Sequence, residues 1–304
     1  MAVPAAALTV RRRRRRYGRY VRAPLTLIAP NLVLFALFFA WPAAIGIAYS
    51  FTNYNGFSAA SFVGLSNYTQ LLGDPLFHSA LVRTLLFTGM VVPLAYVLSL
   101  TIAMLLVSRY AKGKLVARVF FFIPWLISPI VNGLIWRWMF GENFGLVNFA
   151  LQRLGLPTLA WQSNGTLSLI VMVMAEAWAG TAFSMLLFVA ALKNVPQVYY
   201  EAAAIDGAPG WRRFWHITLP GIRWTSFIVV LLTTIGTMKE YALIIAFGNG
   251  GPGTENNLMV QYIYQTGFQE TRIGYGSAAS LVLMLLLMAV AMLQILVNRR
   301  REKA

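Results

Sequence analysis

The 304-residue sequence contains no cysteine and only two histidines, so it lacks the side chains that hold most transition metals. Without thiols the chain forms neither disulfides nor thiolate metal sites. His78 and His216 lie in separate segments, which excludes a metal site built on neighbouring histidines. We therefore expect no metal site in this chain.

Motifs for nucleotide binding are also missing. The single Gly-Lys pair, Gly113-Lys114, is followed by Leu115, whereas a P-loop needs glycines before the lysine and a hydroxyl after it. We expect no catalytic residue and no cofactor in this chain. If the protein drives active transport, the energy has to come from another subunit or from an ion gradient.

Charge is scarce and apolar residues are abundant. Charged residues make up 11% of the chain and hydrophobic residues 59%, against roughly 25% and roughly 45 to 50% in soluble domains. Such a composition does not cover a water-facing surface. The sequence predicts an all-α membrane protein.

Six apolar stretches reach the roughly 20 residues that a helix needs to cross a bilayer. They are Leu25–Tyr49, Leu81–Val107, Val119–Phe140, Leu167–Leu192, Trp224–Phe247 and Tyr275–Val297. Six transmembrane helices place both termini on one side. Prolines within the first three spans should bend those helices because each removes a backbone donor, whereas the last span has no proline and should be straight.

Lys and Arg are distributed unevenly among the segments that join these spans. Eight lie in the N-terminal tail and four each in the second loop, the fourth loop and the C-terminal tail, while the opposite face carries four. Because positive residues accumulate on the cytoplasmic side, both termini are predicted to be cytoplasmic.

The Arg-rich tail, residues 1–24, contains the run Arg11–Arg16. Its simplest role is to orient the first helix and to contact anionic lipid headgroups; the alternative is an arm that binds nucleic acid. A cleavable signal peptide is not expected, because the apolar run exceeds the about 7 to 15 residues of such signals. The predicted organisation is this tail, a six-helix domain over 25–297 and a basic cytoplasmic tail over 298–304, with membrane lipid and no nucleic acid as partner.

The fourth loop, residues 193–223, reads as a short helix followed by a turn. Pro196 suits the first helical position, and Gln197–Asp206 favours a helix, with Ala202–Ala204 the strongest helix formers. Gly207 is expected to cap its C-terminus, because glycine enters the left-handed region without strain.

A second helix is predicted from Pro209 through Trp211 and Trp215, ending before Pro220. Alternatively, the loop could form an amphipathic helix that lies on the membrane surface and is anchored there by Trp211 and Trp215. The residues alone leave both interpretations of the loop open.

The sequence Glu201-Ala202-Ala203, with Gly207 four residues later and Leu219-Pro220 beyond it, resembles the EAA loop of permease subunits from binding-protein-dependent ABC importers. The run from Glu201 to Pro220 is similar to the carbohydrate-uptake branch, the maltose and glycerol-3-phosphate type. Two segments on the other face also resemble this branch, Phe62-Val63-Gly64-Leu65 through Phe77 and Gly250-Gly251-Pro252 through Phe268. The resemblance covers the chain from about Phe35 to the C-terminus, with departures at Arg83, Ala242 and Asn256.

This resemblance implies a location, a set of partners and a set of contact residues. The short helix would be a coupling helix that docks into a groove of a separate ATPase, through Glu201, Ala202, Ala203, Asp206 and Gly207. The implied partners are a second homologous permease that completes a heterodimer, two ATPase subunits that bind ATP and Mg, and an extracytoplasmic solute-binding protein. The implied location is the bacterial inner membrane, where the chain would be a multi-pass protein.

Three charged residues, Glu176, Lys239 and Glu240, fall inside predicted spans, where each costs about 2.5 to 3.5 kcal/mol on insertion scales and therefore points to function. Glu176 and Lys239 lie at similar depths and could form an ion pair that holds the fourth and fifth spans together. Lys239 and Glu240 would be about 100° apart around one helix, so they cannot face each other. Either one could contact Glu176, while the other lines a cavity or meets a partner permease.

Neighbouring rings and hydroxyls complete a candidate substrate pathway. Aromatic faces beside hydroxyl groups suit a sugar, although they suit interhelical packing equally well. The pathway candidates are Glu176, Trp178, Thr181, Thr237, Lys239, Glu240 and Tyr241.

The sequence thus predicts the permease subunit of an ATP-driven importer, which contributes to the pathway of a sugar or sugar-like solute and has no catalytic centre of its own. A proton-coupled secondary transporter that uses Glu176 and Glu240 is the alternative, and a membrane enzyme is a third class that lacks a catalytic constellation. The residues do not decide between a saccharide and a glycerol phosphate ester.

Overall fold

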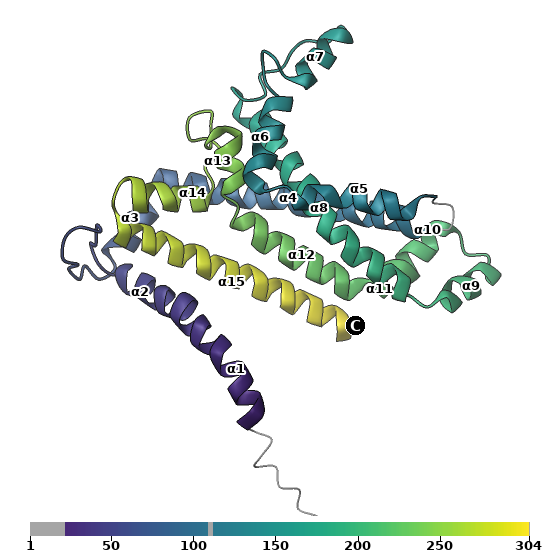
Figure 1. The fold of residues 1–304 in the computed structure, drawn as a ribbon, viewed down its shortest axis with the longest axis horizontal. Coiled ribbons are helices and arrows are strands. Elements are labelled where there is room, and N and C mark those ends of the chain that lie inside the picture. Colours follow the sequence, from purple (N-terminus) through teal and green to yellow (C-terminus); the bar gives the residue numbers. More distant parts are fainter. Residues whose placement is uncertain (1–21, 109–111, 304) are drawn as a thin grey trace, which may run out of the picture. The chain divides into compact units, whose positions relative to one another are not determined.

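The computed structural model describes residues 22–108 and 112–303 (Figure 1). Within these ranges the ordered elements are helices, and the extended pairing is a single isolated bridge between Thr52 and Phe62. The predicted all-α class is confirmed. The arginine run Arg11–Arg16 and Arg109 lie outside the described residues.

The first compact unit ends at residue 48. It contains α1 (Arg22–Phe35), a π-helical turn η2 (Ala36–Ala40) and most of α2 (Trp41–Tyr49). Pro42, the second residue of α2, has no N–H to offer to a carbonyl one turn earlier, so the wider turn just before it accommodates it. The apolar stretch Leu27–Tyr49 is long enough to cross a membrane.

The second unit, from residue 49 onward, is built on four long helices. They are α4 (Pro75–Val107), α8 (Gly165–Asn194), α12 (Arg223–Met238) and α15 (Ile273–Lys303). α4 packs against α8, and α12 packs against α4, α8 and α15. In Figure 1 these helices run alongside one another. As expected, α15 is uninterrupted.

Capping side chains define where two of these helices begin. The Asp74 carboxylate accepts hydrogen bonds from the N–H groups of Leu76 (2.8 Å) and Phe77 (3.4 Å) at the start of α4. The Asn164 side chain accepts from two N–H groups at the start of α8, both at 3.0 Å. These contacts satisfy backbone donors that have no partner within the helix.

The predicted third span is broken rather than gently bent. It consists of α5 (Lys114–Leu126) and α6 (Pro129–Met139), which meet at 100°. Ser128 caps α6, with Pro129 in the first helical position. Because the helical region is disfavoured for a residue before proline, the extended conformation of Ser128 is a favourable place for the chain to turn.

The predicted fifth span is also broken, and the expectation of one continuous helix over Trp224–Phe247 was wrong. α12 ends at Met238, residues 239–241 are not helical, and α13 (Ala242–Gly248) follows. The Glu240 carboxylate accepts a hydrogen bond from the Leu243 N–H (2.8 Å), which starts a new helix locally. Side chains that bond the backbone in this way compete with helix continuation.

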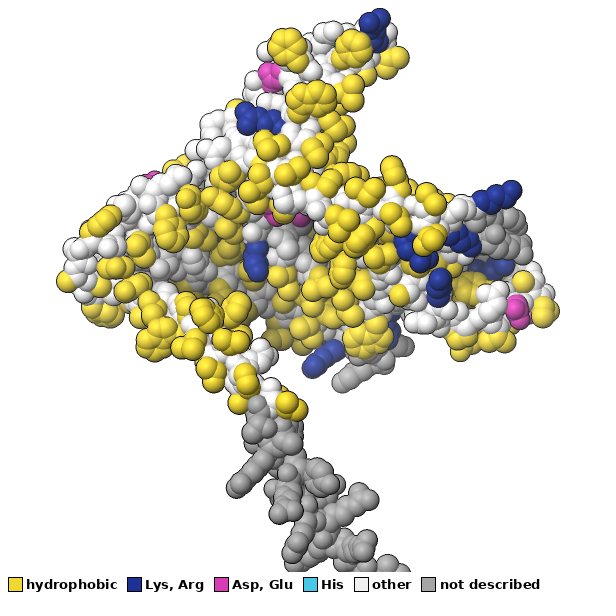
Figure 2. All heavy atoms as spheres, viewed as in Figure 1, with side chains coloured by type: hydrophobic (Ala, Val, Ile, Leu, Met, Phe, Trp, Pro, Cys, Tyr) yellow, Lys and Arg dark blue, Asp and Glu magenta, His cyan; other side chains and the backbone are white. Residues whose placement is uncertain are grey.

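By length and composition the described part of the chain has four membrane-crossing helices, or six if each bent pair counts as one span. The second bent pair joins α10–α11 (Gly210–Gly221) to α12 at 70°. Large apolar side chains cover much of the visible surface, and basic groups gather toward the end that carries α9 and α10 (Figure 2). This distribution fits helices that face lipid.

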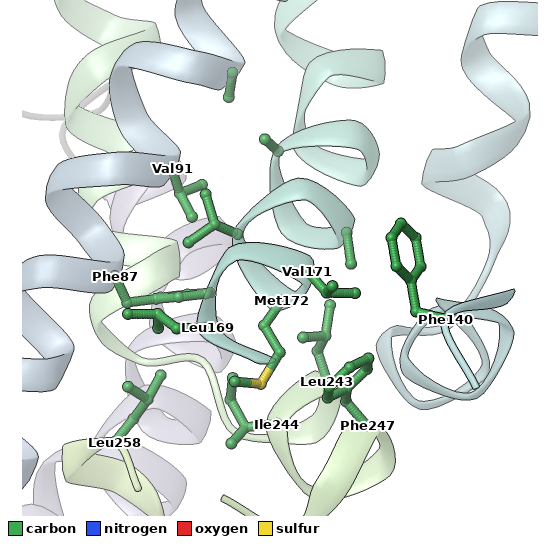
Figure 3. Packing of buried hydrophobic residues seen from close by; sticks show 14 residues of the cluster. Phe87, Val91, Phe140, Leu169, Val171, Met172, Leu243, Ile244, Phe247 and Leu258 are labelled. Carbon is green, nitrogen blue, oxygen red and sulfur yellow. The ribbon is translucent and has the colours of Figure 1, made fainter. Parts of the chain in front are cut away.

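One core cluster joins α4, α8 and α13. Phe87 from α4, Met172 from α8 and Phe247 from α13 are each no more than 1% exposed and lie together in Figure 3. α6 packs closely on α13, because Gly133 leaves no space for a side chain between itself and the Leu243 carbonyl. The half-helices α6 and α13 therefore form a pair beside the long helices.

The remaining elements are short. They are α3 (Ser66–Gly73), α7 (Leu146–Arg153), α9 (Gln197–Ile205), α14 (Met259–Tyr264) and the π-helical turns η3 (Phe214–Thr218) and η4 (Gln265–Gln269). α3 and α14 each pack against α4 and α15.

Candidate functional site

The fourth loop contains the predicted short helix. α9 begins after Pro196 and runs to Ile205. Gly207 has a φ of +70°, and the Ala208 N–H donates to the Ala203 carbonyl at 2.8 Å. This is the hydrogen-bond pattern of a glycine C-cap, so the predicted cap at Gly207 is confirmed.

The residues proposed for ATPase contact lie on an open surface. Glu201, Ala202, Asp206 and Gly207 are exposed, and Ala203 is half-buried. α9 also exposes large apolar side chains, namely Val198 (60%), Tyr199 (57%) and Ile205 (87%). Within the described residues Glu201 forms no ion pair. The helix thus presents a mixed acidic and apolar face.

The second helix of the loop was expected to end before Pro220, but the helical segment continues to Gly221. α10 (Gly210–Arg213), η3 and α11 (Leu219–Gly221) follow one another without a gap. The π turn places Pro220 where its missing N–H costs little. Only Ile222, which is 1% exposed, separates this segment from α12.

α9 is fixed to this segment by a side-chain contact. The hydroxyls of Tyr200 and Thr218 lie 2.9 Å apart and share a hydrogen bond. A pocket of about 850 Å³ with a mixed polar and apolar lining lies between α9 and the ends of α4 and α8, and Lys193 and Arg213 contribute to it. α9 therefore connects to the start of α12 through one covalent path and one hydrogen bond.

The three charges predicted inside the spans come together only in part. Glu176 lies within α8 and is half-buried, and Glu240 lies in the break between α12 and α13, near enough for their carboxylates to interact electrostatically. Lys239 is exposed and forms no ion pair within the described ranges. The expected pairing of Glu176 with Lys239 is absent there, because the break at 239–241 removes the helical geometry on which it depended.

The other pathway candidates do not share one surface. Thr237 is buried and donates to Thr88 on α4 (3.2 Å) and to the Thr233 carbonyl (2.9 Å). Thr181 donates to the Ala177 carbonyl (2.6 Å). The Thr237 hydroxyl therefore joins α12 to α4, whereas the Thr181 hydroxyl bonds within its own helix.

The rings of Trp178 and Tyr241 belong to different environments. Trp178 and Thr181 line an apolar pocket of about 240 Å³ between α4, α5 and α8. Tyr241 lies in the break and packs against Tyr264, with ring centres 5.4 Å apart. Of the predicted set, only Lys239, Glu240 and Tyr241 are adjacent at the break.

A polar node around Asp74 was not predicted as a functional or structural centre. The Asp74 carboxylate accepts hydrogen bonds from the hydroxyls of Tyr262 (2.5 Å) and Tyr275 (2.9 Å) in addition to the two backbone donors of its cap. Arg272 lies over the Tyr275 ring at 4.1 Å. The node joins the start of α4 to α14 and α15.

The electrostatics of this node follow from its donors. Burial by itself would raise the pKa of Asp74, but the hydrogen bonds from Tyr262, Tyr275, Leu76 and Phe77 outweigh it and hold the pKa below its ordinary value of 3.8. Burial and the acceptance of its proton by Asp74 raise the pKa of Tyr262. Asp74 and Tyr262 are 188 positions apart in the chain, so no local sequence pattern predicts their contact.

A second unpredicted centre organises the connection between α6 and α8. The Asn148 side chain accepts from the Leu159 N–H (3.1 Å) and the Trp161 indole (2.8 Å). Glu142 accepts from the N–H groups of Ser163 (2.6 Å) and Gln162 (2.8 Å), and these bonds lower its pKa. Hydrogen bonds from these two side chains therefore hold the connection in a defined conformation.

Comparison with known proteins identifies the family and the fold of this chain. Residues 79–303 match the family described as binding-protein-dependent transport system inner membrane component. The chain is 34% identical over 275 residues to the sn-glycerol-3-phosphate transport system permease protein UgpA of Brucella suis biovar 1, covering 89% of this chain and 92% of that protein. It is also 34% identical to the arabinooligosaccharides transport system permease protein AraP of Bacillus subtilis, covering 90% and 87%.

Solved structures show the same fold. A bacterial ABC transporter involved in the import of the acidic polysaccharide alginate superposes with a TM-score of 0.81 at 20% identity, covering 93% of this chain and 96% of that chain. The same TM-score is found for a bacterial alginate ABC transporter in complex with an alginate pentasaccharide-bound periplasmic protein. The chain belongs to the family of inner membrane components of binding-protein-dependent transport systems.

Proposed function

We propose that this chain is one of two permease subunits in an ATP-driven importer of a sugar or sugar-like solute. It would cross the bacterial inner membrane six times, with each bent helix pair forming one span and both termini in the cytoplasm. A second, related permease would complete the pathway. An extracytoplasmic binding protein would deliver the solute, as family membership leads us to expect. ATP and Mg would bind to two separate ATPase subunits.

The observation that carries this proposal is the form of α9. It is a short helix with a defined end at Gly207, and it offers the exposed Glu201 among exposed apolar side chains. Helix faces of this kind dock into grooves of partner proteins. The basic groups near α9 support a cytoplasmic location.

The same geometry supports a mechanism of coupling. α9 is joined through the short turn at residues 206–209 to the continuous segment α10, η3 and α11 that leads to α12, and the Tyr200–Thr218 hydrogen bond ties α9 to that segment. Closure of the ATPase subunits on ATP would therefore move α9 and α12 together. Such a motion shifts the permease between inward-facing and outward-facing states only as far as the partners prefer one of them.

A proton-coupled carrier is less well supported. Glu176 and Glu240 could exchange protons, but the relatives by sequence are permease proteins of transport systems with several components, and α9 would have no role in a carrier. We retain Glu176, Lys239, Glu240 and Tyr241 as pathway residues, and regard Trp178, Thr181 and Thr237 as packing residues beside the pathway.

The proposal is tested by purification of the importer through a tag on this chain. We expect an ATPase subunit to co-purify, and ATP hydrolysis to rise when loaded binding protein is added. Glu201→Lys should reduce the stimulated hydrolysis by about tenfold, which corresponds to about 1.4 kcal/mol of lost coupling, while insertion into the membrane is unchanged. Gln152→Lys, at an exposed position of α7, is the control and should have no effect.

Uptake by this chain alone, without an ATPase, would refute the proposal. Normal coupling in Glu201→Lys would refute the assignment of α9 as the docking helix.

A further inference from the structure

Three aromatic rings form a continuous row beside the break in the fifth span. Tyr241 from the break packs on Tyr264 of α14 with ring centres 5.4 Å apart, and Tyr264 packs on Phe268 of η4 at 5.6 Å. The residues come from segments on either side of α13, so the row is a product of the tertiary structure.

Two rings of the row are exposed and the third is half-buried, and the two tyrosine hydroxyls are available to a ligand. Tyr264 is 41% and Phe268 66% exposed, whereas Tyr262 of the same short helix α14 is 3% exposed. The hydroxyls of Tyr241 and Tyr264 have no hydrogen-bond partner within the described ranges, while the hydroxyl of Tyr262 bonds Asp74 and Tyr275. α14 thus uses one tyrosine to hold the fold and presents the other outward.

Charged groups stand at the Tyr241 end of the row. Lys239 is exposed and Glu240 is half-buried, with one carboxylate oxygen on the Leu243 N–H. Charges are expensive against hydrocarbon and almost always face a cavity or the interior of a bundle in membrane proteins. A row that begins at Lys239 and Glu240 therefore belongs to a wetted surface rather than to a lipid-facing one.

These features fit one class of ligand. Aromatic side chains with a polar edge bind molecules that combine apolar faces with hydroxyls, and the spare acceptor of Glu240 and the donors of Lys239 suit hydroxyl groups. A phosphate ester offers no flat apolar face.

On the basis of the proposed importer function, we propose that Tyr241, Tyr264 and Phe268 form a binding track for a neutral saccharide of at least two units. Successive sugar rings stack on successive aromatic rings of the track, and Lys239 and Glu240 bind hydroxyls at its inner end. The track extends the pathway from η4 to the break between α12 and α13.

The experiment uses the complete importer in proteoliposomes with its binding protein. The probes are a mixture of neutral di- to tetrasaccharides from starch, xylan and arabinan, and sn-glycerol 3-phosphate, and uptake is measured by mass spectrometry. Tyr264→Leu and Phe268→Leu remove a ring face but keep apolar volume. Tyr264→Phe keeps the face, and Phe144→Leu, at a 93% exposed ring outside the track, is the matched control.

We expect each leucine variant to lower uptake of the favoured saccharide at subsaturating concentration by about tenfold, with the yield of the assembled complex unchanged. Tyr264→Phe and Phe144→Leu should stay within about twofold of the wild type. Uptake of sn-glycerol 3-phosphate in place of every saccharide, or wild-type saccharide uptake in both leucine variants, would overturn the track.

The outcomes separate the two proposals. If ATP-dependent uptake occurs but ignores the row, the track is wrong and the importer stands. If the assembled chains show no ATP-dependent uptake of any probe, both fail. A loss of complex assembly in Tyr264→Leu and Phe268→Leu, but not in Phe144→Leu, would identify the row as a contact with the second permease and overturn the saccharide assignment.

Discussion

The Asp74 node and the exposed helix α9 each contain an acidic residue, but the two residues have opposite roles. The Asp74 carboxylate receives hydrogen bonds from two tyrosines and two backbone N–H groups and holds three elements together. Glu201 is exposed and forms no ion pair in the described part of the chain. An acid whose hydrogen bonds are satisfied internally stabilises the fold, whereas an exposed acid on a capped helix is available to a partner.

The largest effect that this comparison predicts is on stability. Asp74→Ala removes a helix cap and leaves two tyrosine hydroxyls without their acceptor, so we expect a loss of about 3 kcal/mol or more in the free energy of unfolding. Thermal unfolding of the purified complex measures this loss. Glu201→Ala is the matched variant and should unfold at the wild-type temperature; equal losses in the two variants would remove the distinction between the regions.

The second effect concerns coupling. Gly207 has a φ of +70° with open space around it, so Gly207→Ala introduces backbone strain of about 1 to 2 kcal/mol rather than a clash. We expect a severalfold loss of stimulated ATP hydrolysis, because the end of α9 shifts against its partner. Gly210→Ala, where φ is not positive and the space is also open, is the control and should hydrolyse ATP normally.

The pH dependence of stability should differ between the two regions. Because the folded pKa of Asp74 lies below 3.8, its contribution is complete above that value and is lost as the pH falls through the folded pKa. Acid unfolding of Asp74→Asn should therefore be less steep than that of the wild type below about pH 4. Glu201→Gln should follow the wild-type curve, and an unchanged slope in Asp74→Asn would contradict the node.

The smallest effect on stability is expected at the break between α12 and α13. Glu240 at this break has fewer internal hydrogen bonds than Asp74, but it is less exposed than Glu201. Glu240→Ala should cost about 1 kcal/mol, because it removes the cap on Leu243. Lys239→Leu should cost less than about 0.5 kcal/mol, as at other positions without a specific contact, yet lower solute uptake. A large loss of stability in Lys239→Leu would indicate an ion pair after all.

Helix α9 and the turn that follows it could be predicted from the sequence because the residues that define them are close together in the chain. Glycine at a left-handed position and prolines at 196 and 209 define the helix and the turn within fifteen residues. The break at Ser128–Pro129 was signalled by proline, although the sharpness of the 100° bend was not.

The break at 239–241 could not be predicted in the same way. Its sequence contains no proline, and its cause is a side chain that bonds a backbone N–H three residues later. The new direction of the chain is the one in which α13 packs closely against α6 at Gly133, a contact between distant segments. The misplaced ion pair between Glu176 and Lys239 followed from the assumption of a continuous helix.

Local features of the sequence were enough to predict an all-α membrane protein with one capped helix in its fourth loop, because apolar length, charge placement and glycine geometry act over short distances. Only the tertiary structure decided the Asp74 node, the meeting of Glu176 with Glu240, and the row of Tyr241, Tyr264 and Phe268. Each of these joins residues distant in the chain, and packing rather than local preference sets which side chains meet.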